Sequence, residues 1–278
     1  MIHAKVIEDS IAAHGKRLTT LQLEYPRFIH AEFMTHRVFS RNASSSRAIP
    51  VAKMIEQVRT KPAMPIHWGK NQPGMQAKEQ VSNETATTAA ANWVRAAVDA
   101  ANRAEVLMDL GIHKQVVNRI LEPFQHIHVV VTATEWENFF ELRDHPDAQP
   151  EIQALAGTMR IAMDCSEPNR VKRDRGDARN WHLPYVSNEE RYVHRDSPEL
   201  LAKLSTARCA RVSYLTHDGA NPSIEKDLEL FDRLVGARPL HASPTEHQAY
   251  PLPLAGQSSK NFKGWRQHRE LIESTLLA

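Results

Sequence analysis

The densest group of residues that could carry chemistry is a serine- and arginine-rich stretch between Thr35 and Arg47. It reads Thr-His-Arg-Val-Phe-Ser-Arg-Asn-Ala-Ser-Ser-Ser-Arg. A guanidinium group can grip a phosphate through two hydrogen bonds, and serine hydroxyl groups can donate to the remaining oxygens. The stretch therefore predicts an anion site. A solvated polar loop with a serine at a helix N-terminus has the same composition and stays open as the alternative.

Arg143 is a second candidate for chemistry. It follows the segment 136–142, whose helical spacing predicts a short helix with Phe139 and Leu142 turned inward and Asn138 near its start. The alternative is a surface charge that complements the dipole at the end of the helix.

A third candidate lies near the C-terminus, in the segment His-Ala-Ser-Pro-Thr-Glu-His at 241–247, after Ala-Arg-Val-Ser-Tyr at 210–214. Two histidines and a glutamate can bind zinc, but their spacing is not that of a zinc-binding helix and no cysteine lies beside them. Ser243 and Glu246 also have the spacing of a capping box at a helix start. We therefore expect no metal site here.

The composition limits the classes of function. The chain has 278 residues, of which 41% are hydrophobic and 24% charged, as in ordinary globular proteins. Its net charge of +2 does not suit nonspecific coating of nucleic acid, and only Cys165 and Cys209 occur, so there is no disulfide framework. No apolar run is long enough to span a membrane and the first residues do not resemble a signal peptide, so we expect a cytoplasmic protein.

The glycines form neither of the common phosphate-binding loop motifs, so side chains and helix ends must bind any nucleotide. The elements that position these residues are predicted from periodicity and from breakers such as proline and glycine. Strands are expected over 18–25 and 126–131, a long loop over 61–75, and a loop-rich insertion over about 165–198. Helices are expected over about 27–36, 51–59, 83–110, 113–121, 135–142, 150–163, 198–212, 222–236 and 262–276. The mixture predicts one α+β domain spanning residues 1–278.

Taken together, the three candidate segments resemble the flavin-dependent (alternative) thymidylate synthases. The motif R-H-R-x-x-S-x-N-E-x-S-x-R-Y of that family is matched at His36, Arg37, Ser40, Asn42, Ser45 and Arg47. A second signature, R-x-x-x-P and then N-F-x-x-L-R and A-Q-x-E-I, is matched at Arg119, Pro123, Asn138, Phe139, Leu142, Arg143, Ala148, Gln149, Glu151 and Ile152. A third, A-R-V-[SC]-Y and then H-x-[ST]-x-x-E-H, is matched by 210–214 and 241–247.

The sequence also departs from the family pattern. The third signature normally comes first, so its place at the end of this chain predicts a circular permutation. Single positions differ as well: Thr35, Ala43 and Ala48 replace an arginine, a glutamate and a tyrosine, Thr132 and Thr134 replace an asparagine and an arginine, Asp147 replaces a histidine near the flavin, and Glu32 replaces a glutamine beside the nucleotide.

The resemblance implies a fold and a reaction. The fold would be a single α+β domain with a mixed or antiparallel sheet and long helices. The reaction would be transfer of a one-carbon unit from methylenetetrahydrofolate to C5 of a pyrimidine deoxynucleoside monophosphate, turning dUMP into dTMP. Hydride would come from FAD that NADPH has reduced, without a nucleophile from the enzyme. The assembly would be a homotetramer with nucleotide and flavin at its subunit interfaces, and no nucleic acid or membrane partner is expected.

The resemblance also implies residue roles. Arg143 would be the catalytic residue, stabilising negative charge on the uracil ring. The substrate-binding residues would be Glu32, Ser45, Ser46, Arg47, Arg119 and Arg143. The cofactor-binding residues would be His36, Arg37, Asn42, Asn138, Asp147, Ser213, His241, Ser243 and Glu246.

Three alternatives remain open from the sequence. Glu32 accepts hydrogen bonds but does not donate them, so a cytosine nucleotide, or transfer of a hydroxymethyl group to dUMP or dCMP, is conceivable. Glu32 could instead simply pair with a neighbouring arginine. A non-catalytic protein that binds nucleotides or RNA through the serine–arginine stretch is the alternative from a different class.

Overall fold

The computed structural model describes residues 1–214, 223–237 and 239–277. Its centre is a five-stranded sheet of order β3-β4-β2-β1-β5, in which β1 pairs with β5 in parallel and the other neighbours are antiparallel. The strands are β1 (His3–Ala12), β2 (Arg17–Pro26), β3 (Ser40–Ala43), β4 (His126–Ala133) and β5 (Asn169–Val171). Short pairs join β6 (Ala249–Pro251) to β9 (Trp265–Gln267) and β7 (Ser258–Ser259) to β8 (Phe262–Lys263).

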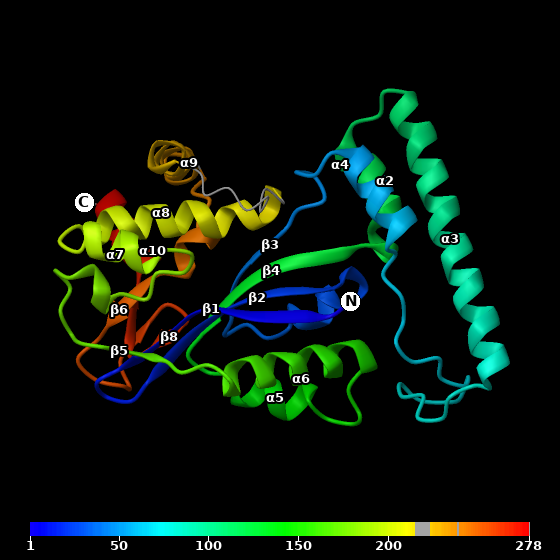
Figure 1. Cartoon of the computed structure of the whole chain (residues 1–278), viewed down its shortest axis with the longest axis horizontal. Helices are drawn as coiled ribbons and strands as arrows, with labels where there is room; N and C mark the ends of the chain where they lie inside the picture. The colour runs from blue at the N-terminus through cyan, green and yellow to red at the C-terminus, as the bar shows by residue number, and fades with distance from the viewer. Residues whose placement is uncertain (215–222, 238, 278) are drawn as a thin grey trace.

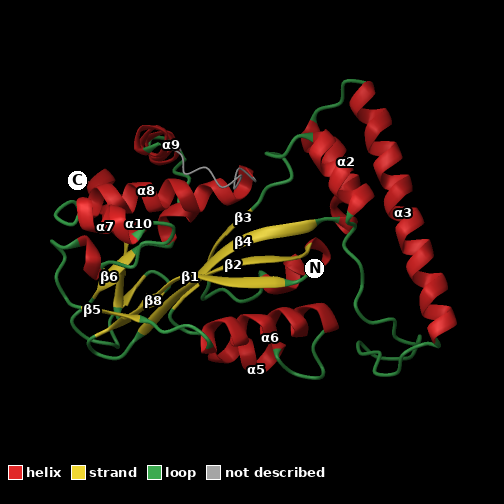
Figure 2. Ribbon diagram, viewed as in Figure 1, coloured by secondary structure: helices red, strands yellow, loops and turns green. Residues whose placement is uncertain are grey.

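Helices cover both sides of this sheet and extend beyond one end of it. In Figure 1, α5 and α6 lie below the sheet, α8 lies above it, and α2 and α3 stand apart at the right. The helices are α1 (His30–Phe33), α2 (Val51–Thr60), α3 (Asn83–Asp109), α4 (Lys114–Val117), α5 (Glu137–Arg143), α6 (Pro150–Asp164), α7 (Asn188–Val193), α8 (Pro198–Ala210), α9 (Ile224–Val235) and α10 (His268–Leu277). The 3-10 turns are η1 (Arg27–Ile29), η2 (Asn118–Phe124), η3 (Ala178–Asn180), η4 (Arg211–Tyr214) and η5 (Ser243–Glu246). The predicted α+β class, with a mixed sheet and long helices, is confirmed (Figure 2).

The two faces of the sheet differ in chemistry because side chains alternate along each strand. On one face, Leu21 and Leu23 of β2 and Val129 and Val131 of β4 are fully buried in one apolar cluster with Leu155 of α6. The residues between them point the other way and include several polar side chains. This second face is covered by the C-terminal part of the chain, which brings the first and third sequence segments together.

The serine–arginine stretch differs from its predicted structure. The helix expected over 27–36 ends at Phe33, where the Thr35 hydroxyl donates to the Glu32 carbonyl at 2.8 Å and the chain turns. After the turn, Phe39 packs against Phe33 with 5.8 Å between ring centroids. Residues 40–43 then form the edge strand β3, which pairs with β4. The expected loop is therefore partly a strand, and its polar side chains point alternately to the two faces.

Other expectations about local structure were wrong in detail. The helix expected over 262–276 begins only at His268, because residues 262–267 pair in β8 and β9. Leu142 is 52% exposed rather than inward, while Phe139 is buried as expected. β1 was missed because Asp9 and Ser10 occupy buried positions and hide its alternation.

The insertion over 165–198 has little regular structure, as expected, but apolar packing, hydrogen bonds and an ion pair hold it against the rest of the protein. Trp181 and Leu183 are fully buried against helix α8. Arg191 donates to the carbonyls of Trp181 and Leu183 at 2.9 and 2.8 Å and forms a 2.6 Å ion pair with Glu8 of β1. Burial outweighs the nearby arginine and raises the pKa of Glu8 to about 7. A buried cation thus joins the insertion to the sheet.

Replacing Asp227 with alanine should lower the free energy of unfolding by about 3 kcal/mol, the lower end for breaking a buried ion pair. Asp227 is fully buried and accepts from Arg208 and Arg211, each at 2.8 Å. The expected loss is at the lower end of this range because Arg208 still forms an ion pair with Glu190, with 2.6 Å between the nitrogen and the oxygen. Urea denaturation measures the effect, with exposed Asp232→Ala on the same helix as the control. Equal stability of the two variants would contradict this role.

Candidate active site

Arg143 lies at the centre of a small polar cluster between α5 and the turn after α1. Its Nε donates to Nε2 of His36 at 3.0 Å, one Nη forms an ion pair with the Glu32 carboxylate, and the other donates to the Thr35 hydroxyl at 3.4 Å. Helix α5 places the arginine there by burying Phe139, one helical turn earlier, against Phe33. The Arg143 side chain keeps 20% of its surface exposed. It is therefore anchored but still able to contact a ligand.

The cluster requires His36 to be neutral. Nε2 of His36 accepts the hydrogen bond from Arg143, so the ring proton must be on Nδ1. Burial, together with the positive charges of Arg143 and Arg41, lowers the pKa of His36. The ring packs against Phe139 at 4.9 Å and Phe39 at 5.8 Å between centroids. His36 is thus held as an oriented, uncharged imidazole at neutral pH.

Strand β3 joins the first sequence segment to the third. The Asn42 amide donates to the Cys209 carbonyl at 2.8 Å, and its oxygen accepts from the Ser243 hydroxyl at 3.2 Å. Glu246 forms an ion pair with Arg269. The capping box expected for Ser243 and Glu246 is absent from η5, which has no side-chain cap. Instead, these two residues bind other parts of the chain, and Asn42 and Ser243 lie in contact across 201 positions of sequence.

Beneath this junction runs a chain of buried hydrogen bonds across the sheet. Ser10 contacts His182 at 2.9 Å, His182 contacts Thr20 at 2.7 Å, Thr20 contacts Thr132 at 2.7 Å, and Thr132 contacts Nδ1 of His247 at 2.8 Å. Nε2 of His247 is buried and has no hydrogen-bond partner among the described residues. Burial lowers the pKa of His247 to about 3, so this end of the chain is a neutral imidazole.

Two of the residues expected to hold the nucleotide phosphate, Ser46 and Arg119, converge on a carboxylate that sequence reasoning missed. Glu122 accepts from Ser46 at 2.9 Å and from Arg119 at 2.8 Å, and it forms an ion pair with Arg27 at 3.1 Å. The Ser45 hydroxyl accepts from the backbone of the same loop. The three-residue spacing from Arg119 to Glu122 was the available signal, since such neighbours meet on a helical turn.

The remaining expected site residues are spread over the surface. Arg37 and Arg47 are exposed, and neither side chain makes a hydrogen bond or ion pair within the described parts of the chain. Asn138 and His241 are also exposed. Asp147 is exposed and pairs with Lys78 at 3.1 Å, which ties the loop after α5 to the long loop before α3. Ser213 is also among the expected site residues. Its backbone belongs to η4, and its side chain is outside the described residues.

The donors present are chemically suited to a dinucleotide cofactor. Arg37 offers a guanidinium group that is unpaired within the described residues for a pyrophosphate, His36 is a neutral ring, and His247 has a buried nitrogen without a partner in the described part of the chain. Among the described residues, no group of three or more histidine, cysteine, aspartate or glutamate side chains is placed to hold a metal ion. Nor does any described helix have both the length and the apolar character needed to cross a bilayer.

The structure thus brings together an anchored guanidinium, Arg143, and a neutral imidazole, His36, with the exposed Arg37 next to that histidine in the turn after α1. The chain belongs to the thymidylate synthase complementing protein family, which it matches over residues 10–168, more than half of its length. It is therefore a thymidylate synthase-like enzyme. The match contains the first two sequence signatures and ends before the third, so the circular permutation stays a prediction.

The solved structures to which the chain is similar include two of one methylase. The chain is similar to a UMP/dUMP methylase, PolB, from Streptomyces cacaoi bound with 5-Br dUMP, with 17% identity and a TM-score of 0.49 over 59% of this chain and 90% of that one. The same methylase bound with 5-Br UMP gives 18% identity and a TM-score of 0.47 over 59% and 88%. No curated protein matches the sequence.

Proposed function

We propose that the protein transfers a one-carbon unit from methylenetetrahydrofolate to C5 of dUMP, forming dTMP, with FAD as its cofactor and NADPH as the reductant. The observation that carries the proposal is the convergence of His36 and Arg143, one from each of two family signatures, on one cluster with Glu32. Burial raises the pKa of the Cys209 thiol well above its usual range, so this cysteine is not suited to act as a nucleophile.

Arg143 acts on the pyrimidine ring in this proposal. Negative charge spreads over N3 and the neighbouring carbonyl oxygens as C5 becomes nucleophilic, and a fixed guanidinium stabilises that charge. Glu32 and His36 hold the guanidinium in place. Because its charge is shared with Glu32, binding of the nucleotide must compete with this ion pair. Arg143 then changes partner from carboxylate to pyrimidine without moving from its helix.

The nucleotide phosphate binds near the loop after β3. The Arg47 side chain is unpaired within the described residues, and Arg119 and Ser46 already point to one acceptor, the carboxylate of Glu122. A phosphate offers more acceptor oxygens than a carboxylate, so it can take over these donors. Ser45 completes the proposed set of substrate-binding residues.

The proposed cofactor residues are His36, Arg37, Asn42, Asn138, Asp147, Ser213, His241, Ser243 and Glu246. A bound flavin supplies hydride transfer, which no side chain can perform. The chain's own residues would bind and orient the cofactor. Arg37 is available to a phosphate, and the Asn42–Ser243 hydrogen bond holds the first and third signatures together.

A homotetramer belongs to the same proposal. Exposed apolar side chains gather on α3 and the following turns, which project from the sheet in Figure 1. These residues are Val94, Val98, Val106, Leu110, Ile112, Val116 and Ile120. Apolar surface of this extent is typical of a face that another protein chain covers.

A second candidate reaction concerns the base and the product. Glu32 presents a carboxylate, which can accept a hydrogen bond from the exocyclic amine of cytosine. Hydroxymethylation of dUMP or dCMP would use the same cluster. The structure also bears out the simpler expectation that Glu32 pairs with a nearby arginine, which is Arg143.

Release of tritium from C5-labelled nucleotide tests the proposal. The protein is incubated with FAD, methylenetetrahydrofolate and NADPH, and with either labelled dUMP or labelled dCMP. We expect release from dUMP only, with dTMP as the product. Release from dCMP, or a hydroxymethylated product, would favour the second candidate. A colourless protein that releases no label and binds RNA in a salt-dependent manner would instead establish the non-catalytic alternative.

A further inference from the structure

A basic pocket lies outside the cluster and outside the family match. Its volume is about 480 Å³, within the range of pockets that hold small ligands. It is formed where the chain after β5 meets the β6–β9 pair, at the left end of the molecule in Figure 1. Its lining residues are Arg173, Arg175, Tyr250, Pro251, Leu252, Pro253, Gln257 and Arg266.

The β6–β9 pair builds one wall of this pocket. Tyr250 and Arg266 are directly opposite each other in the antiparallel pairing, so their side chains share a face. The Arg175 guanidinium lies 5.8 Å from the centre of the Tyr250 ring. Tyr250 also packs against buried Trp181, with 4.8 Å between the ring centroids. An aromatic ring in a fixed position therefore stands beside two guanidinium groups.

The charges in the pocket are not fully balanced. Arg175 pairs with Glu199 at 3.2 Å, and Arg266 pairs with Glu270. Arg173 forms no side-chain hydrogen bond or ion pair with a described residue. Nε of Arg266 is buried, and it has no partner in the part of the chain that the structure describes. Three guanidiniums thus face two carboxylates, leaving one positive charge and one buried donor to satisfy.

We propose that this pocket binds a nucleotide carrying two or three phosphates, as a second ligand site of the protein. Guanidinium groups favour phosphate oxygens, and the Tyr250 ring with its neighbouring prolines offers a flat apolar wall for a base. Both features are needed by a nucleotide, whereas inorganic phosphate would use only the arginines. No lining residue belongs to the cluster around Arg143, so the site does not depend on the reaction proposed above.

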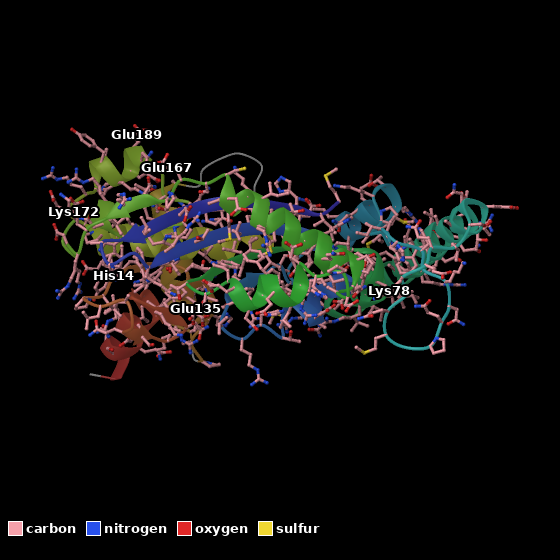
Figure 3. The ribbon with its side chains drawn as sticks, turned by 90° about the horizontal axis from the view of Figure 1, so that it is seen from below. His14, Lys78, Glu135, Glu167, Lys172 and Glu189 are labelled. Atoms are coloured by element: carbon pink, nitrogen blue, oxygen red, sulfur yellow. The ribbon has the colours of Figure 1, made fainter. Side chains whose placement is uncertain are left out.

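Calorimetric titration with ATP, in the presence of saturating dUMP, tests this site in the full-length protein. The critical variant is Arg173→Ala. The control is Lys172→Ala, which removes an equal charge from the neighbouring residue, whose side chain does not line the pocket. Figure 3 places Lys172 at the left edge of the molecule. We expect Arg173→Ala to weaken ATP binding about tenfold, which is the loss of one charge-assisted hydrogen bond. Lys172→Ala should change it less than about twofold, as for an exposed charge.

Inorganic tripolyphosphate and a single-stranded oligonucleotide complete the experiment. Tripolyphosphate should bind more weakly than ATP, because it cannot contact Tyr250. Equal losses in the two variants would show diffuse charge attraction and overturn the proposal. So would tripolyphosphate binding as tightly as ATP, an oligonucleotide binding more tightly than ATP, or no heat with ATP up to about 1 mM. Because both substituted residues are exposed, matching thermal unfolding curves will show that neither variant has lost its fold.

Discussion

Replacing Arg143 with alanine is expected to reduce turnover by about 10²–10³-fold, the usual loss when one fixed donor to a developing anion is removed. The reason is geometric. Arg143 is the only guanidinium that the described structure ties to both Glu32 and His36, and its remaining exposure leaves it accessible to a ligand. The measurement is steady-state release of tritium from C5-labelled dUMP.

Flavin binding separates a catalytic loss from a folding loss in this experiment. The Arg143→Ala protein should still bind FAD and show its yellow absorbance. Arg160→Ala is the matched control, because Arg160 lies on neighbouring α6, pairs with Asp144 at 2.8 Å and does not contact the cluster. The control should keep its turnover. If Arg143→Ala retains activity, or if both variants lose it equally, the role assigned to Arg143 is wrong.

Acidification is expected to destabilise the protein steeply below pH 6.5. Burial lowers the pKa of His182 well below its usual value, that of His247 to about 3 and that of His268 to about 4. Below pH 6.5 these histidines bind protons in the unfolded chain but stay neutral in the folded chain, so the free energy of unfolding falls as pH falls. Each fully buried histidine should remove about 1.4 kcal/mol per pH unit until its folded pKa is reached.

One buried acid works in the opposite direction. The pKa of Glu8 is raised to about 7, so the folded state binds this proton more tightly and gains stability as pH falls from 7 towards 4.5. Three histidines outweigh one glutamate, and the net effect remains a loss. Urea denaturation at pH 7.5, 6.5 and 5.5 measures it, and His268→Gln should reduce the pH dependence. Equal stability at pH 7.5 and 5.5 would contradict burial of neutral histidines.

The sequence predicts those elements whose periodicity comes from their own residues. Helix α3 is alanine-rich and ends before Gly111, and α6 begins at Pro150 and carries an apolar stripe, so both were found. Strand β3 was not found because it has only four residues, two of them polar and buried. It is a strand only because β4 lies beside it, and such a long-range pairing leaves no local pattern.

The candidate site was predictable in its residues but not in its contacts. Family motifs pointed to Arg143, His36 and Asn42, yet the sequence could not show that Arg143 reaches His36 or that Asn42 meets Ser243. These pairs are separated by more than 100 positions, and only the folded sheet brings them together. Glu122 was missed because two of its three partners, Ser46 and Arg27, come from distant parts of the chain, and only Arg119 is a local neighbour.

The absorbance of bound FAD on addition of dUMP tests the central claim most directly. If the chain gathers these arginines, hydroxyls and amides around a flavin that lies against a pyrimidine nucleotide, dUMP must perturb the flavin spectrum. We predict a saturable difference spectrum in the native protein that is lost or greatly weakened in Arg143→Ala. A protein that binds FAD but shows no spectral change with dUMP, or that binds no FAD at all, would contradict the account.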